Sequence, residues 1–158
     1  MADLSGLNTV IANLQKEVKK IEGRSLKGLI RAGLIVLRSV ETKEPLTPLD
    51  LTNLRASRTL ITSNGGVPMG PSPTFKGKKA GELSTDHSSF INGAEALLNQ
   101  TDMPGVALGF SAKYAAEVHE MTGVDWQRKG SGGKFFEKAI DNNIDEMVKV
   151  ISKEAKIK

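Results

Sequence analysis

The apolar residues at the start of the chain recur with the period of an α-helix. Their spacing alternates between three and four, which places on one stripe of a helical surface Leu4, Leu7, Ile11, Leu14, Val18 and Ile21. Asp3 or Ser5 can cap the start of this helix, and Gly23 is a typical helix end. The same spacing also fits the seam of a coiled coil, but we favour an amphipathic helix that packs against its own domain.

The following segment predicts a second helix, which ends before a pair of prolines. Ser25 can cap its start. Its broad apolar face consists of Leu26, Leu29, Ile30, Leu34, Leu37 and Val40. Gly28 and Gly33 each cost about 1 kcal/mol relative to alanine in a helix interior. They either let another helix or strand approach closely or are simply tolerated. Pro45 and Pro48 end the helical stretch.

Two short segments have the composition of β-strands. Residues 57–63 are rich in β-branched side chains and precede Asn64-Gly65-Gly66, while residues 106–110 follow Pro104-Gly105. Upstream of the first strand, Asp, Thr and Asn within residues 49–57 favour a turn or one capped helical turn. The two strands therefore predict a small antiparallel sheet.

Helical patterns return in the last third of the chain. Residues 113–120 predict a short helix that closes at Gly123. After the glycine-rich residues 130–133, a last helix is indicated by apolar residues at helical spacing, namely Phe136, Ile140, Ile144, Met147 and Ile151. This helix carries alternating charges on its remaining positions, which is typical of a helix with one face on a core.

The middle of the chain has a different character. Gly, Pro and Ser dominate residues 64–82, and a short helix around residues 95–98 is the only regular element that we expect before residue 105. The order of all these elements predicts an α+β fold. We expect one domain over residues 1–158, with long N-terminal amphipathic helices, a small antiparallel sheet, a C-terminal helix and a long basic loop at about 64–105.

The composition is that of a folded protein in which helices dominate the core. Hydrophobic residues make up 39% of the 158 positions and charged residues 25%. Aromatic residues, at 4%, leave few rings on which bases could stack, which disfavours single-stranded nucleic-acid binding. The absence of cysteine excludes disulfides and thiolate metal ligands and agrees with a reducing cytoplasm. No apolar run is long enough to span a bilayer, and the N-terminus lacks the pattern of a signal peptide.

No motif in the chain predicts catalysis. His119-Glu120 starts like a zinc-binding helix, but the second histidine would stand at position 123, which is glycine. Only His87 remains, and no cysteine, so a nitrogen-sulfur metal site cannot be assembled within one chain. Gly133-Lys134 and Gly77-Lys78 lack the flanking residues of a phosphate loop. We therefore expect no enzyme, no metal and no cofactor.

The basic part of the central loop is the remaining candidate for function. Lys76, Lys78 and Lys79 are followed by no acidic residue until Glu82. A charged, mobile loop of this kind can simply be solvated. Alternatively, it can be directed at a partner subunit or at DNA. The net charge of +4 permits nearby DNA without requiring it.

Three blocks of the sequence together resemble a family of minor tail and tail-completion proteins of tailed bacteriophages. The first block is Pro45-x-Thr47-Pro48-x-Asp50-x-Thr52-Asn53-Leu54-Arg55-x-Ser57, similar to the family's Pro followed by Thr-Gly-Asn-Leu-Arg-x-Ser. The second is Tyr114-Ala115-x-x-Val118-His119-Glu120, similar to Tyr-Ala-x-Tyr-Val-His-Glu. The third is Gly133-Lys134-Phe135-Phe136-Glu137-Lys138-Ala139-Ile140, similar to Pro-Lys-Phe-Leu-Glu-x-Ala at the start of the C-terminal helix.

The order and spacing of these blocks match the family, and the resemblance covers most of the chain except residues 64–105. The chain departs from the family at three positions. Thr52 stands where the family has glycine, Glu117 where it has an aromatic residue, and Gly133 where it has proline.

The resemblance implies a non-enzymatic virion protein that is assembled in the host cytoplasm. Such subunits form sixfold or twelvefold rings at the head–tail junction, between a connector or stopper and a tail terminator or tube, with no membrane involved. Tyr114, Val118, Phe135 and Phe136 are then expected to anchor the domain core. The candidates for contact with a partner or with genomic DNA in the channel are Arg55, Lys76, Lys78 and Lys79.

Other functions stay open on the sequence. The chain could be the tail terminator or another tail component, which sequence does not separate from a neck protein. From a different class, it could be a basic DNA-binding protein, although no helix-turn-helix or other reading element is identifiable. A strong dependence of affinity on salt would favour that alternative.

Overall fold

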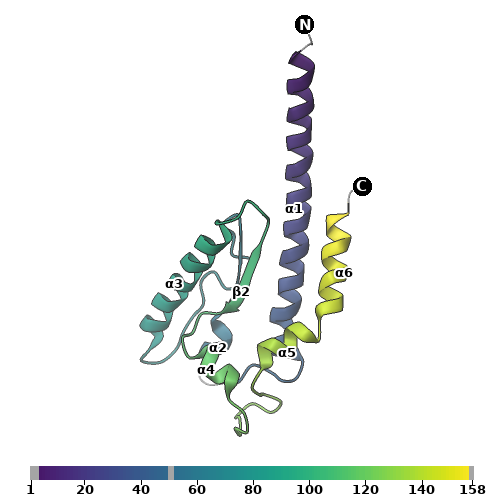
Figure 1. The fold of residues 1–158 in the computed structure, drawn as a ribbon. Helices are drawn as coiled ribbons and strands as arrows, with labels where there is room; N and C mark the ends of the chain where they lie inside the picture. Colours follow the sequence, from purple (N-terminus) through teal and green to yellow (C-terminus); the bar gives the residue numbers. More distant parts are fainter. Residues whose placement is uncertain (1–3, 50–51, 157–158) are drawn as a thin grey trace.

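The computed structural model describes residues 4–49 and 52–156. Its longest element is α1 (Leu4–Thr42), one uninterrupted helix of 39 residues, or about 58 Å at 1.5 Å per residue. The prediction of two helices separated at Gly23 is therefore wrong. A single interior glycine costs about 1 kcal/mol, and the residues on both sides continue the helical hydrogen bonding through it. In Figure 1 the N-terminal half of α1 stands clear of the rest of the molecule.

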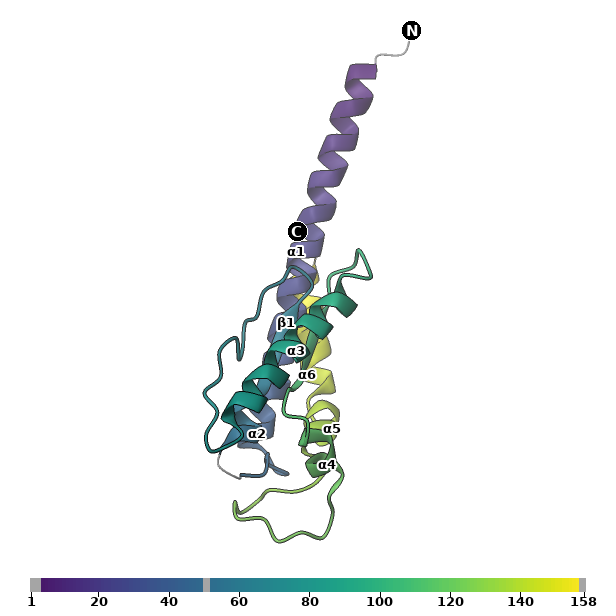
Figure 2. The same ribbon diagram turned by 90° about the vertical axis from the view of Figure 1, so that its left-hand side faces the viewer.

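A small antiparallel sheet lies at the centre of the folded body. The short helix α2 (Asn53–Ala56) leads into β1 (Arg58–Thr62), which pairs with β2 (Val106–Phe110) so that Leu60 lies opposite Leu108. Both strands were predicted, and the α+β fold class is confirmed. In Figures 1 and 2 the sheet lies between α1 on one face and α3 (Ala80–Leu98) on the other. This arrangement explains why four of the five residues of β1 are buried.

Helix α3 occupies much of the segment that was expected to be a loop. The predicted loop at 64–105 is therefore wrong over residues 80–94, whereas the short helix expected around residues 95–98 is confirmed as the end of α3. The irregular connection before α3 is limited to residues 63–79. The buried face of α3 consists of Leu83, His87 and Ala94, which is too sparse to stand out as an apolar stripe. Several hydroxyl side chains on α3, such as Ser84 and Ser88, donate to the carbonyl one turn earlier and so do not interrupt the helix.

The C-terminal region folds as three helices. After α4 (Ala115–Glu120), the predicted last helix is split into α5 (Phe135–Asp141) and α6 (Ile144–Ala155). The expectation of one continuous helix is wrong. Between α5 and α6 stands Asn143, which is only 2% exposed and whose side chain is held by buried hydrogen bonds. Its Nδ2 donates to Ser39 Oγ at 2.9 Å and to the Ala139 carbonyl at 2.7 Å. The bend turns α6 back so that it runs antiparallel beside α1 (Figure 1).

The hydrophobic core fills the space between the lower half of α1, the sheet and α5. Its buried members are Val36, Val40, Leu54, Phe75, Leu83, Ala112, Ala115, Phe135 and Ala139. Two glycines of α1 bring neighbouring elements close. A Cβ on Gly28 would lie 3.0 Å from Ile151 Cα, and one on Gly33 would lie 2.4 Å from Leu60 Cδ1. Close approach, rather than tolerance, therefore accounts for both glycines.

Candidate partner and DNA contact surface

Three of the four residues predicted to contact a partner or DNA lie together beside a cleft at the start of α3. The cleft has a volume of about 770 Å³ and is lined by residues 76–79, the first turns of α3, Lys113 and Tyr114. Lys76, Lys78 and Lys79 are all exposed. Within the described part of the chain, none of these three ammonium groups takes part in an ion pair.

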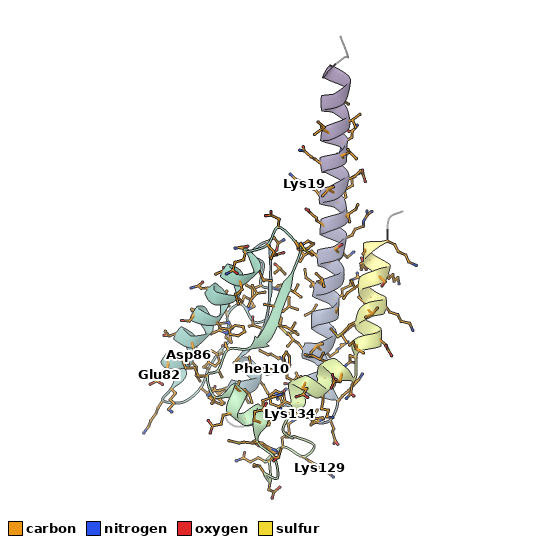
Figure 3. All side chains as sticks on the ribbon, in the orientation of Figure 1. Lys19, Glu82, Asp86, Phe110, Lys129 and Lys134 are labelled. Carbon is orange, nitrogen blue, oxygen red and sulfur yellow. The ribbon has the colours of Figure 1, made fainter. Side chains whose placement is uncertain are left out.

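Acidic groups also line this cleft. Asp86 and Glu82, labelled in Figure 3 near the start of α3, both belong to the lining. Lys113 Nζ lies 2.7 Å from Asp86 Oδ1, and this hydrogen bond raises the pKa of Lys113 above its ordinary value. The cleft therefore combines four lysines with two carboxylates. It can attract an anion without discriminating among base sequences, since lysine contacts with phosphates carry no sequence information.

Asn53 fixes the backbone from which these lysines project. Its Nδ2 donates to the Lys76 carbonyl at 2.9 Å, and the Lys76 N–H donates to its Oδ1 at 2.8 Å. One amide side chain thus satisfies both polar groups of the Lys76 backbone. Leu54, the next residue of the same motif, is 2% exposed and belongs to the core.

The connection between β1 and α3 is held against the body at further points. Phe75 is buried in the core, and the Thr59 hydroxyl donates to the Met69 carbonyl at 2.9 Å. His87, on the buried face of α3, donates from Nε2 to the Gly70 carbonyl at 2.7 Å, and its Nδ1 lies 2.7 Å from Ser111 Oγ. The expectation of a free, mobile loop therefore does not describe this segment, although its lysine side chains project into solvent.

Arg55, the fourth predicted contact residue, belongs to a different group of side chains. Its guanidinium pairs with Glu41 Oε2, which also receives Arg128 Nη1 at 3.3 Å, while Arg58 Nη1 lies 3.1 Å from the other oxygen. The Glu41 side chain is 9% exposed, so three arginines compensate one largely buried carboxylate. This cluster ties α1 to α2, β1 and the segment before α5. Arg55 therefore has a structural ion pair and does not lie beside the lysine cleft.

The second and third sequence blocks pack against each other. Lys134 N–H donates to the His119 carbonyl at 2.6 Å, and the His119 ring meets the Phe135 ring edge-on at 5.1 Å. Phe110 of β2 meets both Phe135 and Phe136 edge-on. Three residues of the second block also pack against or within this core, namely Tyr114, Ala115 and Val118. Asp50, from the first block, lies outside the described residues.

Gly133 is required by this packing. A Cβ at this position would lie 2.1 Å from the Met121 carbonyl oxygen, so neither alanine nor proline fits the local backbone. Next to it, Lys134 adopts a left-handed backbone conformation with φ of 57°.

The Lys134 side chain forms an exposed ion pair with Glu120, 2.6 Å from Oε2. The hydrogen bond that Lys134 donates to the Glu120 carboxylate lowers the pKa of Glu120 and raises the pKa of Lys134. Figure 3 shows Lys134 and Lys129 at the end of the molecule opposite the N-terminus. This end therefore carries charged groups of both signs, while the projecting end of α1 carries the exposed apolar residues described next.

The sequence interpretation placed the N-terminal half of α1 wrongly. The helix was expected to pack its apolar stripe against its own domain, but Val10, Ile11, Leu14 and Val18 are 53%, 44%, 61% and 51% exposed. Residues 9–20 are all exposed, and burial begins only at residue 21. The signal was present in the strict three-and-four spacing, which also fits a helix that pairs with something outside its own domain.

The searches for other kinds of site gave the following results. Among residues 4–49 and 52–156, no three His, Asp or Glu side chains are grouped so that they could hold a metal ion. No helix in that part of the chain is long and apolar enough to cross a membrane. In comparisons with known proteins, no family model, no curated protein and no solved structure matches the chain.

Proposed function

We propose that this chain is a structural subunit of a tailed-bacteriophage virion that forms a ring at the head–tail junction and joins the connector to the tail. On this proposal it acts by shape, and its partners are other copies of itself, the connector or stopper above and the tail terminator or tube below. The three sequence blocks that resemble tail-completion proteins suggest the family.

The projecting half of α1 is the observation that carries the proposal. A monomeric protein that functions alone rarely leaves a row of large apolar side chains along a solvated helix, because covering them is favourable. Four such residues follow one another over the exposed turns, from Val10 to Val18. A subunit of a larger assembly has this property, since neighbouring subunits complete its surface.

The distribution of charge supports the same function. Lys76, Lys78 and Lys79 lie at the start of α3, which Figure 1 shows away from the projecting half of α1. A ring that surrounds DNA or meets an acidic partner needs cations on one side of each subunit and apolar contacts between subunits. Lysines on an ordered backbone can supply non-specific contact with the phosphates of DNA in a channel.

A DNA-binding protein is the second candidate function. The observation that favours it is that Lys76, Lys78 and Lys79 form no ion pair with the part of the chain that the structure describes. The two functions differ in what the purified chain does in solution. We expect light scattering without DNA to give the mass of six or twelve copies of the 17.0 kDa chain. A small dimer that binds duplex tightly and releases it as salt rises would refute the ring proposal and support DNA binding.

A further inference from the structure

The exposed apolar row of α1 lies on the face of the helix that α6 covers further down. Counting in sevens, the repeat of a helix that pairs with another helix, Leu14 leads to Gly28 and Val18 leads to Ser39. A helix that is not supercoiled drifts by about 20° per heptad, so these positions share a face to within about 40–60°. We call this face, from Ile11 to Ser39, the α1 seam.

Helix α6 occupies the lower half of the α1 seam. A Cβ on Gly28 would lie 3.0 Å from Ile151 Cα, and Asn143, at the start of α6, donates to Ser39 Oγ at 2.9 Å. Because α6 runs antiparallel to α1 (Figure 1), its last residue, Ala155, lies about four positions above Gly28, level with position 24. Above that level the seam is exposed to solvent over residues 9–20.

The exposed half of the seam has the surface of a helix that pairs with another helix. It carries a shallow hollow of about 510 Å³, which is lined by Ile11, Leu14, Gln15, Val18, Lys19 and Glu22. The first four of these residues are spaced like the four that surround one inserted side chain in a pair of helices. The lining contains one lysine and one glutamate, and Glu17 is already paired with Lys20 of its own helix at 2.6 Å. The hollow therefore suits an apolar side chain and not an ion.

We infer that two copies of this chain pair through the projecting halves of their α1 helices, which lie antiparallel along the α1 seam. The second helix takes the place in the upper half of the seam that α6 takes in the lower half, and it runs in the same direction as α6. Its N-terminal end approaches the C-terminal end of α6, where the partial charges of the two helix ends have opposite sign. The contact is two-fold symmetric, so each copy supplies and receives the same surface.

The end of α6 determines the register of the pair. Helix α1 begins at Leu4. When this residue is placed just above the end of α6, it lies level with about position 21 of the other helix. Residues whose numbers add up to about 25 are then level, so Ile11 of each copy lies beside Leu14 of the other and enters its hollow. The two helices overlap over residues 4–21, which is about 27 Å.

A parallel pair conflicts with the position of α6. If the two seams faced each other in the same direction, the α6 helices of both copies would stand between the two α1 helices below position 24. Packed helices lie about 8–10 Å apart, and one uninterrupted helix of 39 residues cannot be in contact above and two helices apart below. In the antiparallel pair, each folded body lies beyond the N-terminal end of the other copy's helix.

The pairing goes beyond the proposed function and does not rest on it. A two-fold pair is complete with two copies, whereas a ring needs a further contact between the bodies. Pairing and ring formation are therefore separate properties of the chain, and each can be absent while the other is present.

Distances between spin labels, measured by double electron–electron resonance, test the pairing. The chain has no cysteine of its own, so Lys16→Cys or Gly23→Cys places one label on each copy. Both positions lie on the side of the helix away from the seam, seven residues apart. In the antiparallel pair, equivalent residues are separated along the helix axis by about 10 Å at position 16 and about 31 Å at position 23. A parallel pair gives the same separation at both.

Two matched variants test whether the seam carries the contact. Leu14→Asp places a charge in the seam, and Ala12→Asp places the same charge on the opposite side of the helix. Both positions are exposed, so neither change disturbs the folded body. We expect a longer distance at position 23 than at position 16, loss of the signal between copies with Leu14→Asp, and no change with Ala12→Asp. Equal distances at positions 16 and 23, or a signal that survives Leu14→Asp, would overturn the inference.

Light scattering of the labelled samples separates the pairing from the proposed function. Particles of two copies that show the expected distances would confirm the pairing and refute the ring. Particles of six or twelve copies that lack these distances would overturn the pairing and leave the ring function standing. Single copies at the concentration of the distance measurement would overturn both.

Discussion

Two glycines in the same helix offer a matched test of how α1 and α6 pack. Both Gly23 and Gly28 lie in α1, and replacing either by alanine improves the intrinsic helix propensity by about 0.5–1 kcal/mol. A Cβ on Gly23 meets nothing within 4 Å. A Cβ on Gly28 would lie 3.0 Å from Ile151 Cα and 3.2 Å from the Ile151 carbonyl oxygen, both of which are backbone atoms of α6.

These distances give the expected sizes. Gly23→Ala should stabilise the protein by about 0.5–1 kcal/mol, which raises Tm by about 1–4 °C in a chain of this length. At Gly28 the same gain is opposed by moving a helix backbone, and inserting one carbon into a packed contact costs about 1–3 kcal/mol. The free energy of unfolding of Gly28→Ala should therefore lie about 1–3 kcal/mol below that of Gly23→Ala.

Urea unfolding followed by circular dichroism measures both variants against the parent. The comparison is made at several protein concentrations, since association would make the apparent stability depend on concentration. Gly23 does not belong to the apolar stripe, so it serves as a control with the same chemistry and helix. If Gly28→Ala were stabilised as much as Gly23→Ala, the close packing of α6 on α1 would be refuted.

Three further predictions concern the motif residues. Thr52→Gly should stabilise the protein by about 1 kcal/mol in thermal unfolding, because Thr52 holds a left-handed backbone conformation with φ of 67° that glycine adopts without strain; an unchanged or lower Tm would contradict this. Asn53→Ala should lower the free energy of unfolding by about 1–3 kcal/mol, because the backbone N–H and carbonyl of Lys76 lose their partner. Trypsin should then cleave after Lys76 faster than in the parent. Unchanged cleavage would mean that Asn53 does not hold this backbone in place. A carbon-detected NMR titration should place the pKa of Glu120 below its ordinary 4.5, and Lys134→Met should return it toward that value. Because this folded-state pKa is lowered, the pair contributes stability above the unfolded value that is lost as pH falls through the folded one.

The strands and the short α2 turn could be predicted because their signals are local. β-Branched residues bounded by Asn64-Gly65-Gly66 and by Pro104-Gly105 define two strands, and the observed bounds of β2 are those predicted. Helix α3, apart from the short helix expected around residues 95–98, could not be found in this way. Its buried positions are few, and His87 is fixed by Ser111 and the Gly70 carbonyl, which are contacts that only the folded chain provides.

The helix boundaries depended on tertiary structure in the same manner. Gly23 suggests a helix end, yet α1 continues through it. No other element lies against this position, since a Cβ on Gly23 would meet nothing within 4 Å. Asn143 breaks the C-terminal helix because its amide reaches Ser39, more than a hundred positions earlier. The periodicity of apolar residues predicts neither the continuity of α1 at Gly23 nor the break at Asn143.

For the candidate site, the sequence identified the lysines but not their setting. Lys76, Lys78 and Lys79 were singled out by charge alone. The hydrogen bonds from Asn53 that hold the Lys76 backbone join residues 23 positions apart. Arg55 was singled out by its place in a motif, and its partner Glu41 comes from a helix with no such motif. The exposed stripe of α1 had a clear pattern, but whether the domain covers that pattern is a property of the fold.

Electron microscopy of the purified protein tests the central claim most directly. Negatively stained particles, sorted into class averages, should show closed rings with a central opening and sixfold or twelvefold rotational symmetry. Leu14→Asp, which places a charge in the middle of the exposed apolar row, should reduce the rings to single subunits that keep the circular dichroism spectrum of the parent. Compact particles without rotational symmetry, unchanged by Leu14→Asp, would contradict the account.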